Sequence, residues 1–255
     1  MKIDSAWKFS ILIYLIVRIL LSLWMWGVRQ VYAQPLEPDP VLRPYVGVEI
    51  EKNPWLEVWQ RWDSLHYQAI AERGYEAFDS ALFVPPLYPL LMRYTSNLLG
   101  INTLLAGIIQ SNIGYIISLA LIYRLALLEF RDPKTAMRSA VYLASFPSAF
   151  FFLAAYTESL FLLTILAMFY ALRRDQWMMA SFWAGMAALI RLPGFVAIIP
   201  LIYYAWQRWR QNNSGKVCFG VLLALVIASL FPCLLYTSDA ADEEDSVDLG
   251  GRRII

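Results

Sequence analysis

Long apolar runs separated by short polar stretches dominate the pattern of the chain. The first run, residues 7–28, contains Arg18 near its centre and has about the 20 residues needed to cross a bilayer. Further apolar segments cover residues 84–99, 104–126, 138–155, 158–173, 176–191, 194–207 and 217–236. The pattern predicts an all-α, polytopic transmembrane helical bundle with about seven spans.

The pattern also divides the chain into four parts. Residues 1–28 form a first transmembrane helix, 29–103 an outer-face loop with interfacial helices, 104–232 a helical bundle and 233–255 a tail. A cleaved signal peptide is the alternative for the first part, because Val31-Tyr32-Ala33 resembles a small-x-small cleavage site. The length of the first apolar run and its interruption by Arg18 favour a retained span.

Basic residues recur in every second connection from residue 104 onward. They are Arg131, Lys134 and Arg138, then Arg173 and Arg174, then Arg208, Arg210 and Lys216. The positive-inside rule puts these loops and the N-terminus in the cytoplasm, so 84–99 is expected to be a re-entrant or surface-lying helix rather than a full span. The 29–80 segment and the turns at 156–158 and 191–194 then share the outer face.

Composition narrows the class of protein. The chain has 255 residues, of which 59% are hydrophobic and 16% charged, and its mean hydropathy is +0.50. These values exclude a disordered chain and an ordinary soluble enzyme. The net charge of +1 gives no footprint for nucleic acid, and two cysteines with one histidine predict neither a disulfide framework nor a metal site.

The segment between Asn53-Pro54, a typical helix start, and Gly74, a typical stop, predicts one helix. Its tryptophans suit the membrane interface, with a stripe formed by Trp55, Trp59, Trp62, His66 and Ile70. Asp63, His66 and Tyr67 share one edge of that helix. Either Asp63 faces water on an interfacial anchor, or it is a general base whose pKa is adjusted by His66.

Two further ionisable residues lie at predicted helix ends. Glu158 begins a helix, where it either stabilises the helix dipole or forms a polar wall of an outer-face site. Arg191 ends a helix before Pro193-Gly194, where it either interacts with the dipole or binds phosphate through its guanidinium group. Arg18, inside the first span, is expected to pair with an acidic group or a lipid phosphate.

Several motifs in order resemble GPI mannosyltransferase 2 (PIG-V type) and its bacterial relatives. The resemblance covers about residues 7–205. It is carried by Val17-Arg18-Ile19-Leu20, Arg61-Trp62-Asp63-Ser64-Leu65-His66-Tyr67, Ala71-Glu72-Arg73-Gly74-Tyr75, Phe83-Val84-Pro85-Pro86-Leu87-Tyr88-Pro89, Tyr156-Thr157-Glu158-Ser159-Leu160-Phe161 and Arg191-Leu192-Pro193-Gly194. The combination is fairly specific, whereas each piece alone is weak.

This resemblance implies a GT-C type glycosyltransferase in the plasma (inner) membrane. It implies that Asp63 deprotonates an acceptor hydroxyl and that a hexose leaves a polyprenyl-phosphate carrier on the outer face with inversion. Arg191 and His66 would hold the phosphate, and Tyr67, Tyr88 and Glu158 would complete the substrate site. The implied partners are the lipid bilayer and the lipid-linked sugar. Since the sequence shows no metal motif, we expect a reaction that uses no metal or other cofactor.

Departures from the family pattern leave alternatives open. Leu192-Pro193 stands where the family more often has a small polar pair, Val84-Pro85-Pro86 is a variant, and family members continue with further spans. A non-catalytic polyprenyl-phosphate-binding protein is one alternative. A transporter is another, which the lack of repeat-related polar helix centres disfavours.

We interpret the tail from Cys233 onward as translated adaptor DNA rather than native protein sequence. The run from Cys233 to Glu243 can be back-translated into the adaptor end of a transposase-based sequencing library, so we expect the native sequence to depart near Pro232. The alternative is a genuine acidic tail.

Overall fold

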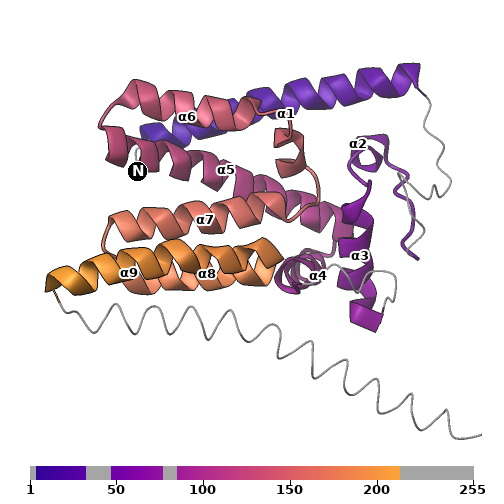
Figure 1. Cartoon of the computed structure of the whole chain (residues 1–255). Coiled ribbons are helices and arrows are strands. Elements are labelled where there is room, and N and C mark those ends of the chain that lie inside the picture. Colours follow the sequence, from indigo (N-terminus) through magenta and orange to yellow (C-terminus); the bar gives the residue numbers. More distant parts are fainter. Residues whose placement is uncertain (1–3, 33–46, 77–84, 213–255) are drawn as a thin grey trace, which may run out of the picture.

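The computed structural model describes residues 4–32, 47–76 and 85–212, and all regular structure in these ranges is helical. Figure 1 shows the arrangement of the helices. They are α1 (Ser5–Val31), α2 (Pro54–Glu57), α3 (Asp63–Arg73), η1 (Gly74–Glu76), α4 (Leu87–Leu99), α5 (Thr103–Phe130), α6 (Pro133–Ser145), η3 (Ala149–Phe152), α7 (Glu158–Arg173), α8 (Trp177–Ile190), η4 (Leu192–Ala197) and α9 (Ile198–Asn212). The predicted segment 217–236 and the tail lie outside the described residues.

Two of the described helices, α1 and α5, are long and apolar enough to cross a membrane, and α8 is a shorter apolar helix. Only 6% of the most apolar window of α1 is buried, against 39% for α5. The predicted segment 138–155 is not one helix, because α6 ends at Ser145 and a 3-10 turn, η3, follows. The fold is therefore an all-helical one that suits a membrane, with α1 at its edge and α5 inside.

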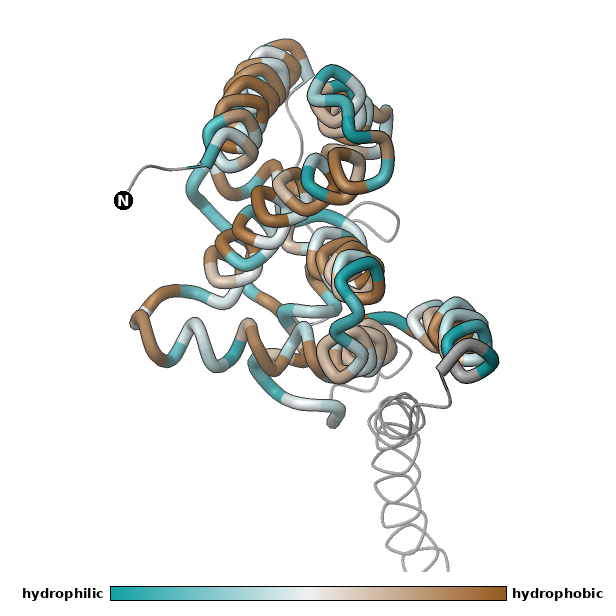
Figure 2. The backbone as a smooth tube through the Cα atoms, turned by 90° about the vertical axis from the view of Figure 1, so that its left-hand side faces the viewer, coloured by the Kyte–Doolittle hydropathy of each residue, from teal (hydrophilic) through white to brown (hydrophobic). Residues whose placement is uncertain are grey.

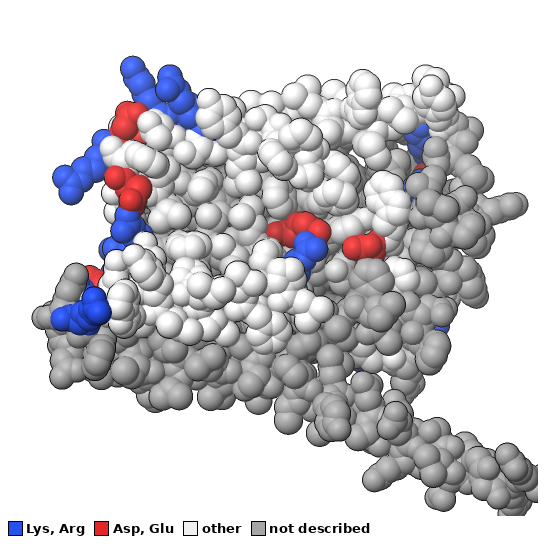
Figure 3. Space-filling view, viewed as in Figure 1, with Lys and Arg blue, Asp and Glu red and all other residues white. Residues whose placement is uncertain are grey.

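The connections collect at two opposite ends of the bundle. The N-terminus, the α5–α6 and α7–α8 connections and the end of α9 lie at one end, which we call the basic end (Figure 1). Figure 2 looks along the bundle from this side, and Figure 3 shows charged side chains gathered there. The described residues of the three basic groups thus share one end, as their sequence spacing predicts, and Lys216 lies outside the described residues. The opposite end, which carries α2, α3 and α4, is called the loop end.

Helix α4 lies across the bundle rather than along it. It is seen almost end-on in Figure 1, between α3 and the end of α8, and it packs against α3 and α5. Pro86 precedes its first turn, and Gly100 ends it in the left-handed region at φ +64°. The crosswise orientation fits the expectation that residues 84–99 do not form a full span.

Small residues allow the bundle helices to approach closely. The buried face of α6 consists of Ala136, Ala140 and Ala144, and Gly114 of α5 lies directly against α7. A Cβ atom on Gly114 would come within 2.7 Å of the Leu160 side chain. Close packing through small residues is typical of helices in membranes, where the hydrophobic effect does not hold helices together.

Candidate active site

Asp63 is the first residue of α3, at the loop end of the bundle. The predicted helix from Asn53 to Gly74 begins and ends as expected: the Asn53 side chain accepts a hydrogen bond from the Trp55 N–H at 3.0 Å, and Gly74 has φ +79°. The prediction of one continuous helix is wrong, because α2 ends at Glu57 and residues 58–62 form a turn. The Arg61 guanidinium donates to the carbonyls of Glu57 and Gln60, both at 3.0 Å, and so replaces their helical partners.

The turn before Asp63 has a backbone conformation that is unfavourable for its sequence. Trp62 has φ +47° and ψ −124°, a region that side-chain-bearing residues rarely adopt and that costs about 1–3 kcal/mol. Three donors hold the Arg61 carbonyl: the Ser64 N–H at 3.2 Å, the Ser64 hydroxyl at 2.8 Å and the Tyr156 hydroxyl at 2.9 Å. These contacts fix the direction in which Asp63 leaves the turn.

The environment of Asp63 favours its protonated form. Burial raises the pKa of the Asp63 carboxyl above its ordinary value, and the positive groups of His66 and Arg191 offset part of this rise. His66 lies one turn later in α3 and is partly exposed. A carboxylate with a raised pKa is a stronger base, so Asp63 is suited to accept a proton from a substrate hydroxyl.

Arg191 and Glu158 form an ion pair beside this carboxyl. Glu158 begins α7 and Arg191 follows the last residue of α8, and the Arg191 Nη1 donates to the Glu158 Oε1 at 2.5 Å. Both side chains are partly exposed, at 33% for Arg191 and 24% for Glu158. Figure 3 shows a small group of opposite charges over the adjoining ends of α7 and α8, on a face that is otherwise largely uncharged. The two residues predicted separately thus act on each other.

Tyr67 and Tyr88 lie beneath the site. The Tyr67 hydroxyl lies 3.4 Å from the Thr157 Oγ1, and burial raises the pKa of Tyr67 to about 12. Tyr88 is 0% exposed, and its hydroxyl lies 2.9 Å from the Ser111 Oγ and donates to the Gly107 carbonyl at 3.2 Å. In the structure Tyr88 attaches α4 to α5, and its contact with a substrate stays a prediction.

Two anchors of α3 were not predicted as functional residues. Arg93 of α4 donates to the carbonyls of Ala71 and Glu72, at 2.6 and 3.0 Å, in the last turn of α3. The side chain of Gln68 donates to Thr103 at the start of α5. A single arginine in the apolar segment 84–99 was the available signal for Arg93, since an unpaired charge there would be costly.

Arg18 has different partners from those expected. Its guanidinium group lies 4.7 Å from the centre of the Trp59 ring and donates to the Leu153 carbonyl at 3.2 Å. Neither of these partners is acidic, and pairing with a lipid phosphate stays a prediction. A guanidinium group interacts favourably with an indole face and needs no full counter-charge there. Arg18 consequently joins α1 to the turn that leads to Asp63.

The structure shows why the Arg191-Leu192-Pro193-Gly194 motif ends in glycine. A Cβ atom at this position would overlap the backbone of Ala187 and Ala188 in α8. The Gly194 N–H also donates to the Arg191 carbonyl at 2.8 Å. The glycine therefore lets η4 fold back on α8 and fixes the position of Arg191.

The described ranges contain no group of three His, Cys, Asp or Glu residues that could hold a metal ion. The ionisable groups near Asp63 are a guanidinium group, an imidazole and a second carboxylate. They can take up a proton, balance a negative charge and accept hydrogen bonds from hydroxyl groups.

The helical fold suits a membrane, and its loop end brings a half-buried carboxyl close to an arginine–glutamate ion pair. The chain belongs to the mannosyltransferase (PIG-V) family, whose family model matches residues 3–239. The match includes Asp63, Glu158 and Arg191 and extends into the predicted tail. Searches of curated proteins and of solved structures gave no match.

Proposed function

We propose that this protein is a GT-C type membrane glycosyltransferase that moves a mannose from a polyprenyl-phosphate carrier to an acceptor hydroxyl. The observation that carries the proposal is the half-buried carboxyl of Asp63, with its raised pKa, within electrostatic reach of Arg191 in a chain of the mannosyltransferase family. The protein crosses the plasma (inner) membrane several times, and the loop end faces away from the cytoplasm.

The proposed reaction assigns a role to each of these groups. The Asp63 carboxylate accepts the proton of the acceptor hydroxyl, and the oxygen attacks the anomeric carbon of the sugar. The bond between that carbon and the phosphate oxygen breaks, the electron pair leaves with the polyprenyl phosphate, and the anomeric configuration inverts. Arg191, which uses one nitrogen for Glu158, directs its remaining donors to the phosphate as its charge grows.

The expected contribution of the base sets the size of the effect. A positioned general base typically accelerates a reaction by about 10²–10⁴-fold, which corresponds to about 3–5 kcal/mol of activation free energy. Replacing Asp63→Asn keeps the shape of the side chain and removes its basicity. We therefore expect a loss of transfer of that order, with retained binding of the lipid-linked sugar.

The test uses the full chain. If the native reading frame departs from this sequence near Pro232, the test uses the native protein. Transfer from radiolabelled polyprenyl-phosphate mannose is compared for the wild type, Asp63→Asn and the control Asp175→Asn, whose carboxylate pairs with Arg208 at the basic end. Wild-type transfer in the control and a large loss in Asp63→Asn support the proposal. Undiminished transfer in Asp63→Asn removes Asp63 from the role, and donor binding without wild-type transfer favours the non-catalytic alternative.

A further inference from the structure

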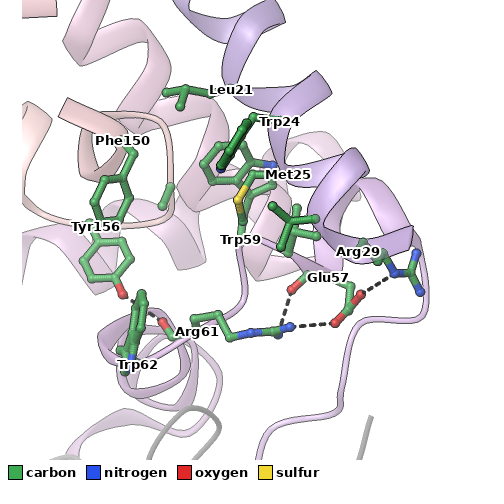
Figure 4. Close-up of a pocket in the computed structure, with 13 residues that line it drawn as sticks. Leu21, Trp24, Met25, Arg29, Glu57, Trp59, Arg61, Trp62, Phe150 and Tyr156 are labelled. Atoms are coloured by element: carbon green, nitrogen blue, oxygen red, sulfur yellow. Dashed lines mark hydrogen bonds and ion pairs between the residues drawn. The ribbon is translucent and has the colours of Figure 1, made fainter. Parts of the chain in front are cut away.

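A cavity of about 410 Å³ lies beside the candidate active site, between the second half of α1, the turn before Asp63 and η3 (Figure 4). Most of its lining is aromatic or aliphatic, including Trp24, Met25, Trp59, Phe150 and Tyr156. Its volume falls in the range of small-molecule sites in proteins. An apolar group of small-molecule size therefore fits this space.

The charged part of the lining lies at one end of the cavity. The Glu57 side chain is only 2% exposed and contacts Arg61 at 2.8 Å and Arg29 at 3.4 Å (Figure 4). Arg61 also donates to two backbone carbonyls, so several of its donors are in use. Arg29 contacts Glu57 through Nε, and its two terminal nitrogens have no other acceptor among the residues that the structure describes. Arg29 and Arg61 both contact the Glu57 carboxylate here, and the two terminal nitrogens of Arg29 form an open donor fork.

Exposed tryptophans near this cavity indicate its position relative to the membrane surface. Trp24, Trp26, Trp55 and Trp62 are exposed around it, and the rings of Trp26 and Trp55 stack at 4.8 Å. Tryptophan is enriched where the hydrocarbon of a membrane meets its head groups. The phosphates of bilayer lipids lie at this depth, and their chains extend along the exposed apolar surface of α1. A bound lipid is thus the occupant that matches both the apolar lining and the charged end.

We propose that this cavity binds an anionic phospholipid, with its phosphate on Arg29 and one acyl chain against Trp24, Met25 and Phe150. The open fork of Arg29 matches two phosphate oxygens. Glu57 lies between Arg29 and Arg61, and Arg61 belongs to the turn that leads to Asp63 (Figure 4). The phosphate on Arg29 is therefore a separate one from the donor phosphate that leaves at Asp63. Because Arg61 and Trp62 are shared by the cavity wall and that turn, the lipid stabilises the catalytic turn, a consequence that rests on the proposed function.

Binding is tested with the full chain in phosphatidylcholine nanodiscs that contain phosphatidylglycerol with a photoreactive acyl chain. We expect cross-links at cavity residues, competed by unlabelled phosphatidylglycerol but not by phosphatidylcholine or inorganic phosphate. Arg29→Gln should weaken the competition at least about tenfold, a free-energy change of about 1.4 kcal/mol. The variant should fold, because Glu57 keeps Arg61 as its partner.

Two further variants make the result specific. Arg138→Gln removes an exposed arginine of α6 at the basic end and should bind lipid like the wild type. Met25→Trp fills the cavity, leaves Arg29 in place and should reduce cross-linking. Equal competition by phosphatidylcholine, or unchanged binding in Arg29→Gln, overturns the proposal and leaves ordinary bilayer lipid as the occupant.

The experiments can reject the proposed lipid site and the proposed glycosyltransferase function independently of each other. Asp63→Asn should bind the photoreactive lipid like the wild type, because binding is measured without a sugar donor. Transfer that depends on Asp63 but not on phosphatidylglycerol rejects the catalytic consequence alone. Lipid binding that depends on Arg29 in a chain without transfer activity rejects the proposed function and supports the lipid site.

Discussion

Replacing Gly194 by alanine tests how Arg191 is held in place. In the structure η4 packs so closely on α8 that a Cβ atom at residue 194 would overlap the backbone atoms of Ala187 and Ala188. A flexible side chain could rotate away from such an overlap, but the backbone of a packed helix cannot. The alanine methyl group therefore forces η4 away from α8, and Arg191 moves with it.

The magnitude follows from the cost of overpacking. An extra methyl group in a well-packed core costs about 1–3 kcal/mol, and contact with rigid backbone places Gly194→Ala at about 3 kcal/mol. For a protein of this size, each kcal/mol lowers the melting temperature by about 2–4 °C, so we expect a decrease of about 6–12 °C. Mannose transfer should fall as well, because the Arg191–Glu158 pair loses its geometry.

The assay is thermal unfolding in detergent, with mannose transfer measured at a temperature where the variant remains folded. Gly27→Ala is the matched control, since Gly27 lies in α1 with no atom within 4 Å of the added Cβ. Alanine should be neutral or stabilising there by about 0.5–1 kcal/mol. A Gly194→Ala protein that melts within about 2 °C of the wild type and transfers mannose normally would refute the reasoning.

Other changes around the turn give distinct results. The raised pKa of Asp63 means that the folded state binds more protons than the unfolded state between the ordinary carboxyl pKa of 3.8 and the folded-state pKa, so the stability of the wild type falls as pH rises through this range. Asp63→Asn should therefore raise the melting temperature at neutral pH. Equal pH profiles of unfolding for the two proteins would contradict this expectation. For the same reason the acidic limb of transfer should lie above the ordinary carboxyl range, and a limb near pH 3.8 would exclude Asp63 as the base. Trp62→Gly relieves the positive φ and should leave stability equal or higher but reduce transfer, measured by kcat. Tyr156→Phe removes one donor to the Arg61 carbonyl and should lower kcat with little change in KM, whereas a purely structural role would lower only the melting temperature.

Local sequence signals predicted much of the loop that carries the site. Asn53 and Gly74 mark its helical limits because their capping conformations depend on neighbouring residues only. The interruption at residues 58–62 was not predictable from the same signals. It depends on the Arg61 guanidinium group, which donates hydrogen bonds to the carbonyls of Glu57 and Gln60. It also depends on the Tyr156 hydroxyl, which donates to the Arg61 carbonyl from far away in the sequence.

The sequence by itself determined the two long apolar helices, α1 and α5, and the common end of the described basic residues, and its motifs selected Asp63 as the candidate base, because these features follow from local composition and motifs. Only the tertiary structure decided that Arg191 pairs with Glu158, that Tyr88 is buried beneath the site and that Arg18 faces Trp59. Partners of a long polar side chain depend on how the helices pack and on which donors remain open there. The spacing of residues in the sequence does not specify how distant segments pack, so the side-chain partners at the site could be assigned only from the folded chain.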